Sequence, residues 1–72
     1  MATRYFELVD DKSQKLWEIA VSGSDVTVRF GRIGTNGQSK TKSLADEAAA
    51  GRHAEKLIAA KTGNGYTESA TA

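Results

Sequence analysis

Phe30, Gly31 and Arg32 place an aromatic ring beside a cation near the end of an expected strand. Alternate side chains of a strand share a face, so Phe30 and Arg32 point the same way and Gly31 puts no side chain between them. A flat ring next to a guanidinium can stack on a sugar or base and hold a phosphate. The same residues also fit a structural role, with Phe30 in the core, Arg32 in solvent and the glycine at a bulge.

The charges around this stretch are uneven. The formal net charge of the chain is only +1, yet segment 29–42 has no acidic residue and four basic ones, Arg29, Arg32, Lys40 and Lys42. Such a segment is typical of an anion-binding face, although lysines on an edge strand also protect a sheet from aggregation.

Residues suited to catalysis or metal binding are sparse. The chain has no cysteine, and its one histidine, His53, falls within an expected helix. One histidine cannot complete a metal site, and no serine has a histidine base in a recognisable arrangement. The glycines at 31, 34 and 37 match neither a dinucleotide fingerprint nor a P-loop. We therefore expect no enzymatic activity, no metal and no cofactor.

The 72 residues allow one domain, which we place at residues 4–68 with flexible ends at 1–3 and 69–72. No long apolar run and no apolar signal segment is present, so we expect a cytoplasmic protein without a membrane span.

The elements that position these residues follow from hydrophobic patterns. Strands are expected at 4–9, at 15–21 and from Val26. A Gly34-Thr35-Asn36-Gly37 turn follows, in which Asn-Gly is a hairpin signal, and then a polar fourth strand at 38–42. Ser43 is expected to cap a helix and Gly63 to end it. Trp17 is assigned to the core. The predicted fold is α+β, a four-stranded antiparallel β-meander with one C-terminal α-helix packed on one face.

Taken in order, these motifs resemble the WGR domain family, named for Trp-Gly-Arg. The resemblance covers residues 4–68 and rests on four segments: 5–8, 15–19, the run 30–38, and the helix with its closing segment, 54–66. The family fold, a small antiparallel sheet with a helix packed on it, agrees with the expected elements. Bacterial members of the family occur alone or attached to other modules.

The resemblance also implies a function. In poly(ADP-ribose) polymerases this domain binds DNA ends and breaks, with its Trp on the sugar of a 5′ terminus and its Arg at the 5′ phosphate or a neighbouring domain. Carried over, Phe30 stacks on a terminal sugar or base, Arg32 engages the phosphate or a partner domain, and Lys61 and Tyr66 add backbone contacts. Phe30 replaces the family's Trp and lacks its indole N–H, and the chain lacks the polymerase domains, so we expect weak affinity.

We therefore predict a non-catalytic module for DNA ends, nicks or single-strand termini. Its predicted contacts are Phe30, Gly31, Arg32, Arg29, Lys40, Lys42, Lys61 and Tyr66. The alternative is a protein interaction module: the exposed fourth strand accepts a partner strand, possible also as a homodimer, or the Phe30–Arg32 patch docks a protein. Salt separates the two readings, because phosphate binding weakens steeply as salt rises.

Overall fold

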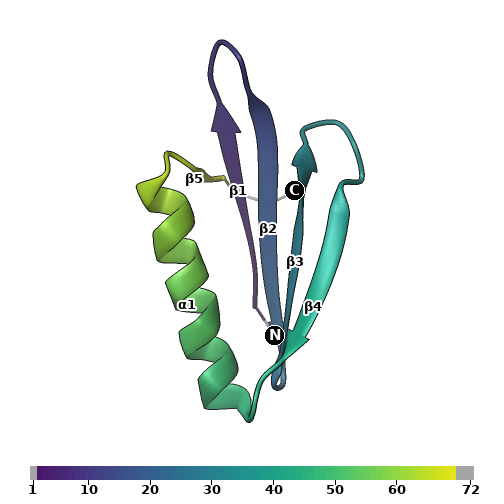
Figure 1. The fold of residues 1–72 in the computed structure, drawn as a ribbon, viewed down its shortest axis with the longest axis vertical. Helices are drawn as coiled ribbons and strands as arrows, with labels where there is room; N and C mark the ends of the chain where they lie inside the picture. The colour runs from purple at the N-terminus through teal and green to yellow at the C-terminus, as the bar shows by residue number, and fades with distance from the viewer. Residues whose placement is uncertain (1, 70–72) are drawn as a thin grey trace.

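The computed structural model describes residues 2–69, which form one antiparallel sheet and one helix. The elements are β1 (Ala2–Val9), β2 (Gln14–Ser22), β3 (Asp25–Arg32), β4 (Gln38–Ser43), α1 (Glu47–Gly63) and β5 (Thr67–Ser69). The strand order is β4-β3-β2-β1-β5, with α1 lying along one side of the sheet (Figure 1). The predicted meander of four strands with a C-terminal helix is confirmed, and β5 extends it beside β1.

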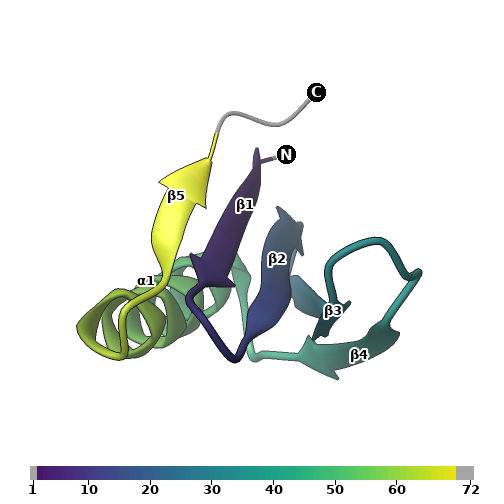
Figure 2. The ribbon, with the colours of Figure 1, turned by 90° about the horizontal axis from the view of Figure 1, so that it is seen from above.

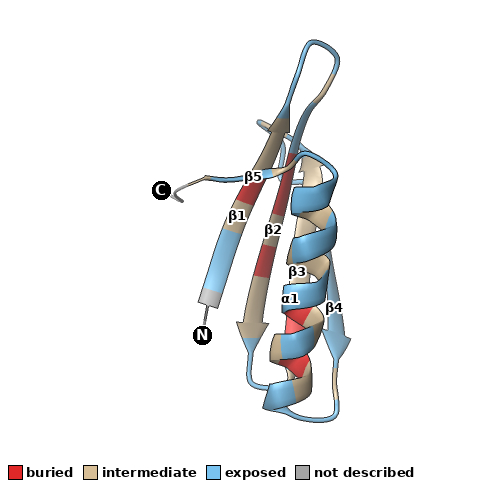
Figure 3. Ribbon diagram, turned by 90° about the vertical axis from the view of Figure 1, so that its left-hand side faces the viewer, coloured by how far each residue is buried: buried red, intermediate tan, exposed pale blue. Residues whose placement is uncertain are grey.

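One face of the sheet carries the core. The strand register places Phe6 opposite Trp17 and Trp17 opposite Phe30, so these three aromatic residues form a row across β1, β2 and β3. Helix α1 covers this face, as Figure 2 shows from above. It contributes Ala50 and Ala54, which are buried against the core, and the small alanine side chains allow a close approach to the sheet. Figure 3 shows the buried residues gathered where α1 faces the strands.

The helix begins later than the sequence predicts. Its N-cap is Asp46, whose carboxylate accepts a hydrogen bond from the backbone N–H of Ala49 at 2.8 Å. The predicted cap at Ser43 is wrong, because Ser43 is the last residue of β4 and its hydroxyl donates to the Asp25 carboxylate at 2.8 Å. Ser43 thus belongs to the sheet.

The helix also ends later than predicted. Gly63 is still helical, and the chain turns at Gly65, which has a φ of +104°. The Gly65 N–H donates to the Thr62 carbonyl and the Tyr66 N–H donates to the Lys61 carbonyl, which is the hydrogen-bond pattern of a Schellman motif. This turn reverses the chain, so that Tyr66 packs against the core and β5 reaches β1.

Strand β5 and the start of β1 occupy segments that the sequence assigns to loose ends. Ala2 and Thr3 belong to β1 and Ser69 belongs to β5, whereas residues 1 and 70–72 lie outside the described residues. The guanidinium of Arg4 donates to both carboxylate oxygens of Glu68, at 2.8 and 2.6 Å, and so ties β1 to β5.

The connection between β3 and β4 is one residue longer than the predicted Gly34-Thr35-Asn36-Gly37 turn. Five residues, 33–37, separate the strands, and the Thr35 N–H closes a turn onto the Arg32 carbonyl at 3.1 Å. Gly34 occupies the third position of this turn with a φ of +93°, as a type II turn requires. The loop therefore contains the predicted turn at 34–37 and one further residue, Ile33.

Candidate nucleic-acid interface

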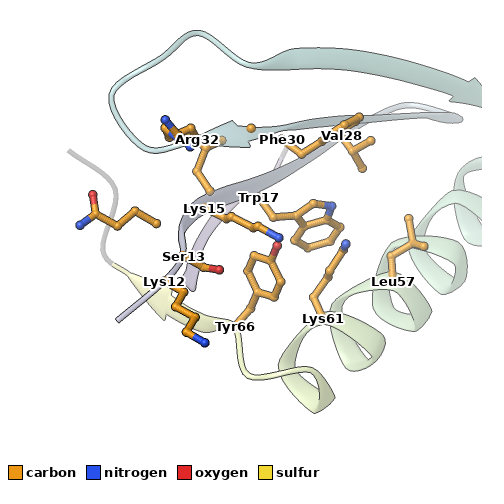
Figure 4. A pocket seen from close by; sticks show the side chains of 13 residues that line it. Lys12, Ser13, Lys15, Trp17, Val28, Phe30, Arg32, Leu57, Lys61 and Tyr66 are labelled. Carbon is orange, nitrogen blue, oxygen red and sulfur yellow. The ribbon is translucent and has the colours of Figure 1, made fainter. Parts of the chain in front are cut away.

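A groove of about 610 Å³ opens between the C-terminal half of α1 and the adjoining ends of β2 and β3. Three aromatic residues line it: Trp17 from β2, Phe30 from β3 and Tyr66 from the turn after α1 (Figure 4). Trp17 is only 3% exposed and Phe30 and Tyr66 are half-buried, so the groove has an apolar floor and partly accessible aromatic walls. Its volume is in the range of small-molecule sites.

The charged side chains that line the groove among the described residues are all basic: Lys12, Lys15, Arg32 and Lys61. Lys40 of β4 adds a further cation, because its Nζ lies 5.9 Å from the centre of the Phe30 ring. Within residues 2–69 the ion pairs are Arg4–Glu68 and Arg29–Glu18, so these five groove cations have no carboxylate partner among the described residues. An acid-free cluster of unpaired cations attracts anions.

Lys61 occupies a defined place between two of the rings. Its Nζ lies 5.7 Å from the centre of the Trp17 ring and 5.3 Å from that of Tyr66. The Schellman turn produces this arrangement, because it sets Tyr66 over the last turn of the helix, where Lys61 also complements the negative end of the helix dipole. The ammonium group is therefore fixed in the groove by the aromatic faces.

Position 31, between Phe30 and Arg32, has no room for any residue larger than glycine. A Cβ built on Gly31 would lie 2.7 Å from the Cα of Gly37, closer than real Cβ atoms come to other heavy atoms. The end of the 33–37 loop therefore passes against β3 on the face opposite the helix, in the space that a side chain at position 31 would need. Both the Thr35 N–H and the Thr35 hydroxyl donate to the Arg32 carbonyl, at 3.1 and 2.7 Å, which fixes the backbone that carries the Arg32 side chain.

The structure brings most of the predicted contacts together. Phe30, Gly31, Arg32, Lys61 and Tyr66 line the groove, and Lys40 lies over the Phe30 ring.

Two predicted contacts lie elsewhere. Arg29 is on the opposite face of β3, where its Nε donates to Glu18 at 3.1 Å. Lys42 is paired with Val26, four residues along β3 from Phe30, and does not line the groove. Neither residue therefore lines the groove.

Sequence reasoning missed Lys12 and Lys15. Lys15 is directly opposite Arg32 in the β2–β3 register and shares a face with Trp17, so counting back by two from Trp17 would have found it. Lys12 offers no such signal, because it lies in the turn between β1 and β2, and only the fold brings that turn to the groove.

Comparison with known proteins supports one assignment. The family model described as the WGR domain matches residues 2–72. The chain belongs to the WGR domain family. WGR domains are binding domains rather than catalytic ones and are often nucleic-acid-binding modules.

Individual relatives agree with this family. The chain is 42% identical to the Escherichia coli protein YehF over 67 residues and 41% identical to the Escherichia coli protein YfeS over 59 residues. These matches cover 93% and 82% of this chain, but the chain spans only 24% of the length of each relative. A crystal structure of a Bacteroides fragilis protein superposes with a TM-score of 0.93 and 45% identity, covering 96% of this chain and 20% of that one. In residues 2–69, no helix has the length and apolar character that crossing a membrane requires.

Proposed function

We propose that this WGR domain is a non-catalytic module that binds 5′-phosphorylated DNA ends in the groove beside the C-terminal half of α1. The observation that carries the proposal is the composition of that groove: three aromatic residues and five cations converge on it, and within residues 2–69 no acidic residue lines it or pairs with these cations. Nucleic-acid termini present both of the matching chemistries, an anionic phosphate and a flat base or sugar.

Arg32 and Lys15 form the phosphate end of the proposed site. They are cross-strand partners on β3 and β2 and point to the same face, so one anion can lie near both side chains. The guanidinium of Arg32 offers a planar fork that can bind two phosphate oxygens, whereas Lys15 contributes a point charge. A terminal phosphate carries more charge than an internal one, and this favours a strand end over the interior of a duplex.

Phe30 and Tyr66 provide the stacking part of the site. Both rings are half-buried, so each is held in place by the core and still keeps part of its surface accessible from the groove. Stacking of a base on an aromatic side chain contributes about 1–3 kcal/mol in proteins that bind single strands. Lys40 above Phe30 and Lys61 above Tyr66 place cations next to the same rings, where the neighbouring backbone phosphates of a bound strand would lie.

The proposed binding is indifferent to sequence. Helix α1 packs its buried residues against the sheet, and the groove offers rings and cations rather than an ordered set of amide groups for base edges. Affinity then comes from phosphates and stacking, which every sequence provides.

A comparison of DNA ends tests the proposal. Fluorescence anisotropy would measure Kd for three labelled duplexes of equal sequence: one with 5′ phosphates, one with 5′ hydroxyls, and one closed by a hairpin loop at each end. We expect the 5′-phosphorylated duplex to bind most tightly and the closed duplex most weakly, with all affinities falling as salt rises. Equal affinity for the three duplexes would refute the preference for ends.

A protein interaction module is the second candidate, and one observation favours it. Strand β4 is exposed along all six residues, and no strand among the described residues pairs with its outer edge. Such an edge can accept a partner strand or that of a second copy. Two results would support this candidate over the first. One is self-association in sedimentation analysis, and the other is binding to a partner protein that does not weaken as salt rises, each in a protein that does not bind DNA.

A further inference from the structure

Arg29 lies on the face of the sheet away from the groove and yet makes contacts that lead back to Arg32. Its Nε donates to the Glu18 carboxylate at 3.1 Å, and its Nη1 donates to the backbone carbonyl of Asn36 at 3.2 Å. The guanidinium therefore joins β2 to the last part of the 33–37 loop. Arg29 and Glu18 are 31% and 27% exposed, so both are held against the sheet rather than extended into solvent.

The same loop is closed onto Arg32 at its other end. The Thr35 N–H and hydroxyl both donate to the Arg32 carbonyl, and the carbonyl that Arg29 binds belongs to the next residue, Asn36. The loop then passes Gly31 so closely that no Cβ fits between them. These contacts, together with the hydrogen bond that the Ile33 N–H donates to the Gln14 carbonyl of β2 at 2.9 Å, fix the loop that follows Arg32. Among the described residues, the Arg29 contact is the one made by a charged side chain.

We infer that Arg29, oriented by Glu18, is a positioning residue that fixes the 33–37 loop and thereby holds Arg32 at the phosphate end of the groove. The inference rests on the proposed function, because it assigns Arg29 a role in phosphate recognition without contact to the ligand. The first part of the loop is held by backbone hydrogen bonds of Ile33 and Thr35, and the charged hydrogen bond from Arg29 restricts its last part at Asn36. A binding group is effective only when its support is rigid.

The substitution Glu18→Gln distinguishes positioning from direct contact by the sign of its effect. If Arg29 bound phosphate directly, removing the neighbouring negative charge would strengthen DNA binding. If Arg29 acts through the loop, the neutral side chain of the Glu18→Gln variant orients its guanidinium less firmly, and the hydrogen bond from Arg29 to the Asn36 carbonyl weakens. The preference for phosphorylated over hydroxyl ends then falls. From the strength of a hydrogen bond that involves a charged group, we expect this preference to fall about tenfold.

Glu68→Gln is the matched control. It makes the same change in net charge and also breaks an arginine ion pair, but on β5, which contributes no residue to the groove. We expect this variant to keep the wild-type preference for phosphorylated ends. Thermal denaturation and a ¹H–¹⁵N spectrum of each variant would check that the fold is retained, and in Glu18→Gln the shifted signals should include residues 33–37.

Arg29→Gln provides a second, independent readout. Loss of a direct contact to a backbone phosphate would weaken binding of phosphorylated and hydroxyl ends alike, whereas lost positioning of Arg32 lowers affinity for the phosphorylated end selectively. A Glu18→Gln variant that binds as tightly as Glu68→Gln, or more tightly, would overturn the inference, as would an equal loss of affinity for the two kinds of end in Arg29→Gln. If wild-type protein itself shows no preference for phosphorylated ends, the proposed function fails instead, so the two failures are distinguishable.

Discussion

Replacing Gly31 by alanine tests the steric account of the Phe-Gly-Arg segment. The new Cβ would meet the Cα of Gly37 at 2.7 Å, and because that atom belongs to the backbone, the loop itself must move. Overpacking of this kind destabilises proteins by about 1–3 kcal/mol. A domain of this size is stable by about 3–5 kcal/mol, so the loss is a large fraction of the total.

The same substitution at Gly51 is predicted to act in the opposite direction. Gly51 lies inside α1, and a Cβ built there meets no atom within 4 Å. Alanine is more favourable than glycine in a helix interior by about 0.8–1.0 kcal/mol, so Gly51→Ala should stabilise the domain. The chemical change is identical in the two variants, and only its surroundings differ.

Urea denaturation followed by tryptophan emission would measure both effects. Trp17 is the single tryptophan of the chain and is buried in the native state, so its emission reports on the core directly. We expect a lower midpoint for Gly31→Ala and a higher midpoint for Gly51→Ala at an unchanged m-value. A Gly31→Ala protein as stable as the wild type would refute the claim that the loop passes too closely for a side chain.

Other substitutions test the site and the core. Arg32→Glu should abolish binding of phosphorylated DNA at an unchanged thermal midpoint, because Arg32 is exposed and lies at the phosphate end of the groove; wild-type affinity in a gel-shift assay would show that it is no phosphate contact. Phe30→Trp should tighten end binding severalfold in an anisotropy titration, since the indole adds stacking area and an N–H donor, and unchanged affinity would argue against stacking at this position. Trp17→Ala should unfold the domain by circular dichroism, because removing a buried tryptophan costs about 3–5 kcal/mol; a folded variant that cannot bind would mean that Trp17 serves the site rather than the core. The Arg4 guanidinium, chiefly through its hydrogen bond, lowers the pKa of Glu68 below its ordinary value of 4.5, so the pair's contribution to stability is present above that value and is lost as pH falls through the lowered pKa; carboxyl ¹³C shifts should give a Glu68 midpoint below 4.5, and a midpoint at 4.5 would contradict the ion pair.

The sheet could be predicted because its strands follow the alternation of side chains. Trp17 and Ile19 fall on one face of β2, and Val26 and Phe30 on one face of β3, and the structure uses these faces for the core. The same alternation separates Arg29 from Phe30. Local charge groups Arg29 with Arg32, whereas the sheet places Arg29 on the face away from the groove.

The parts that sequence reasoning missed depend on contacts between distant residues. Ser43 and Asp46 are both good N-cap residues, and the hydrogen bond from Ser43 to Asp25 on β3 keeps Ser43 in the sheet. Strand β5 consists of three polar residues with no strand pattern, and it pairs with β1 beside the Arg4–Glu68 ion pair.

An NMR titration of labelled protein with a short 5′-phosphorylated duplex, at low and moderate salt, tests the central claim most directly. The account predicts shifts that cluster at the groove residues and diminish as salt rises; the residues to follow are Lys12, Lys15, Phe30, Arg32, Lys40, Lys61 and Tyr66. Lys42 and Val9, which lie outside the groove, serve as internal references. An unchanged spectrum at low salt, or shifts confined to residues outside the groove, would contradict the account.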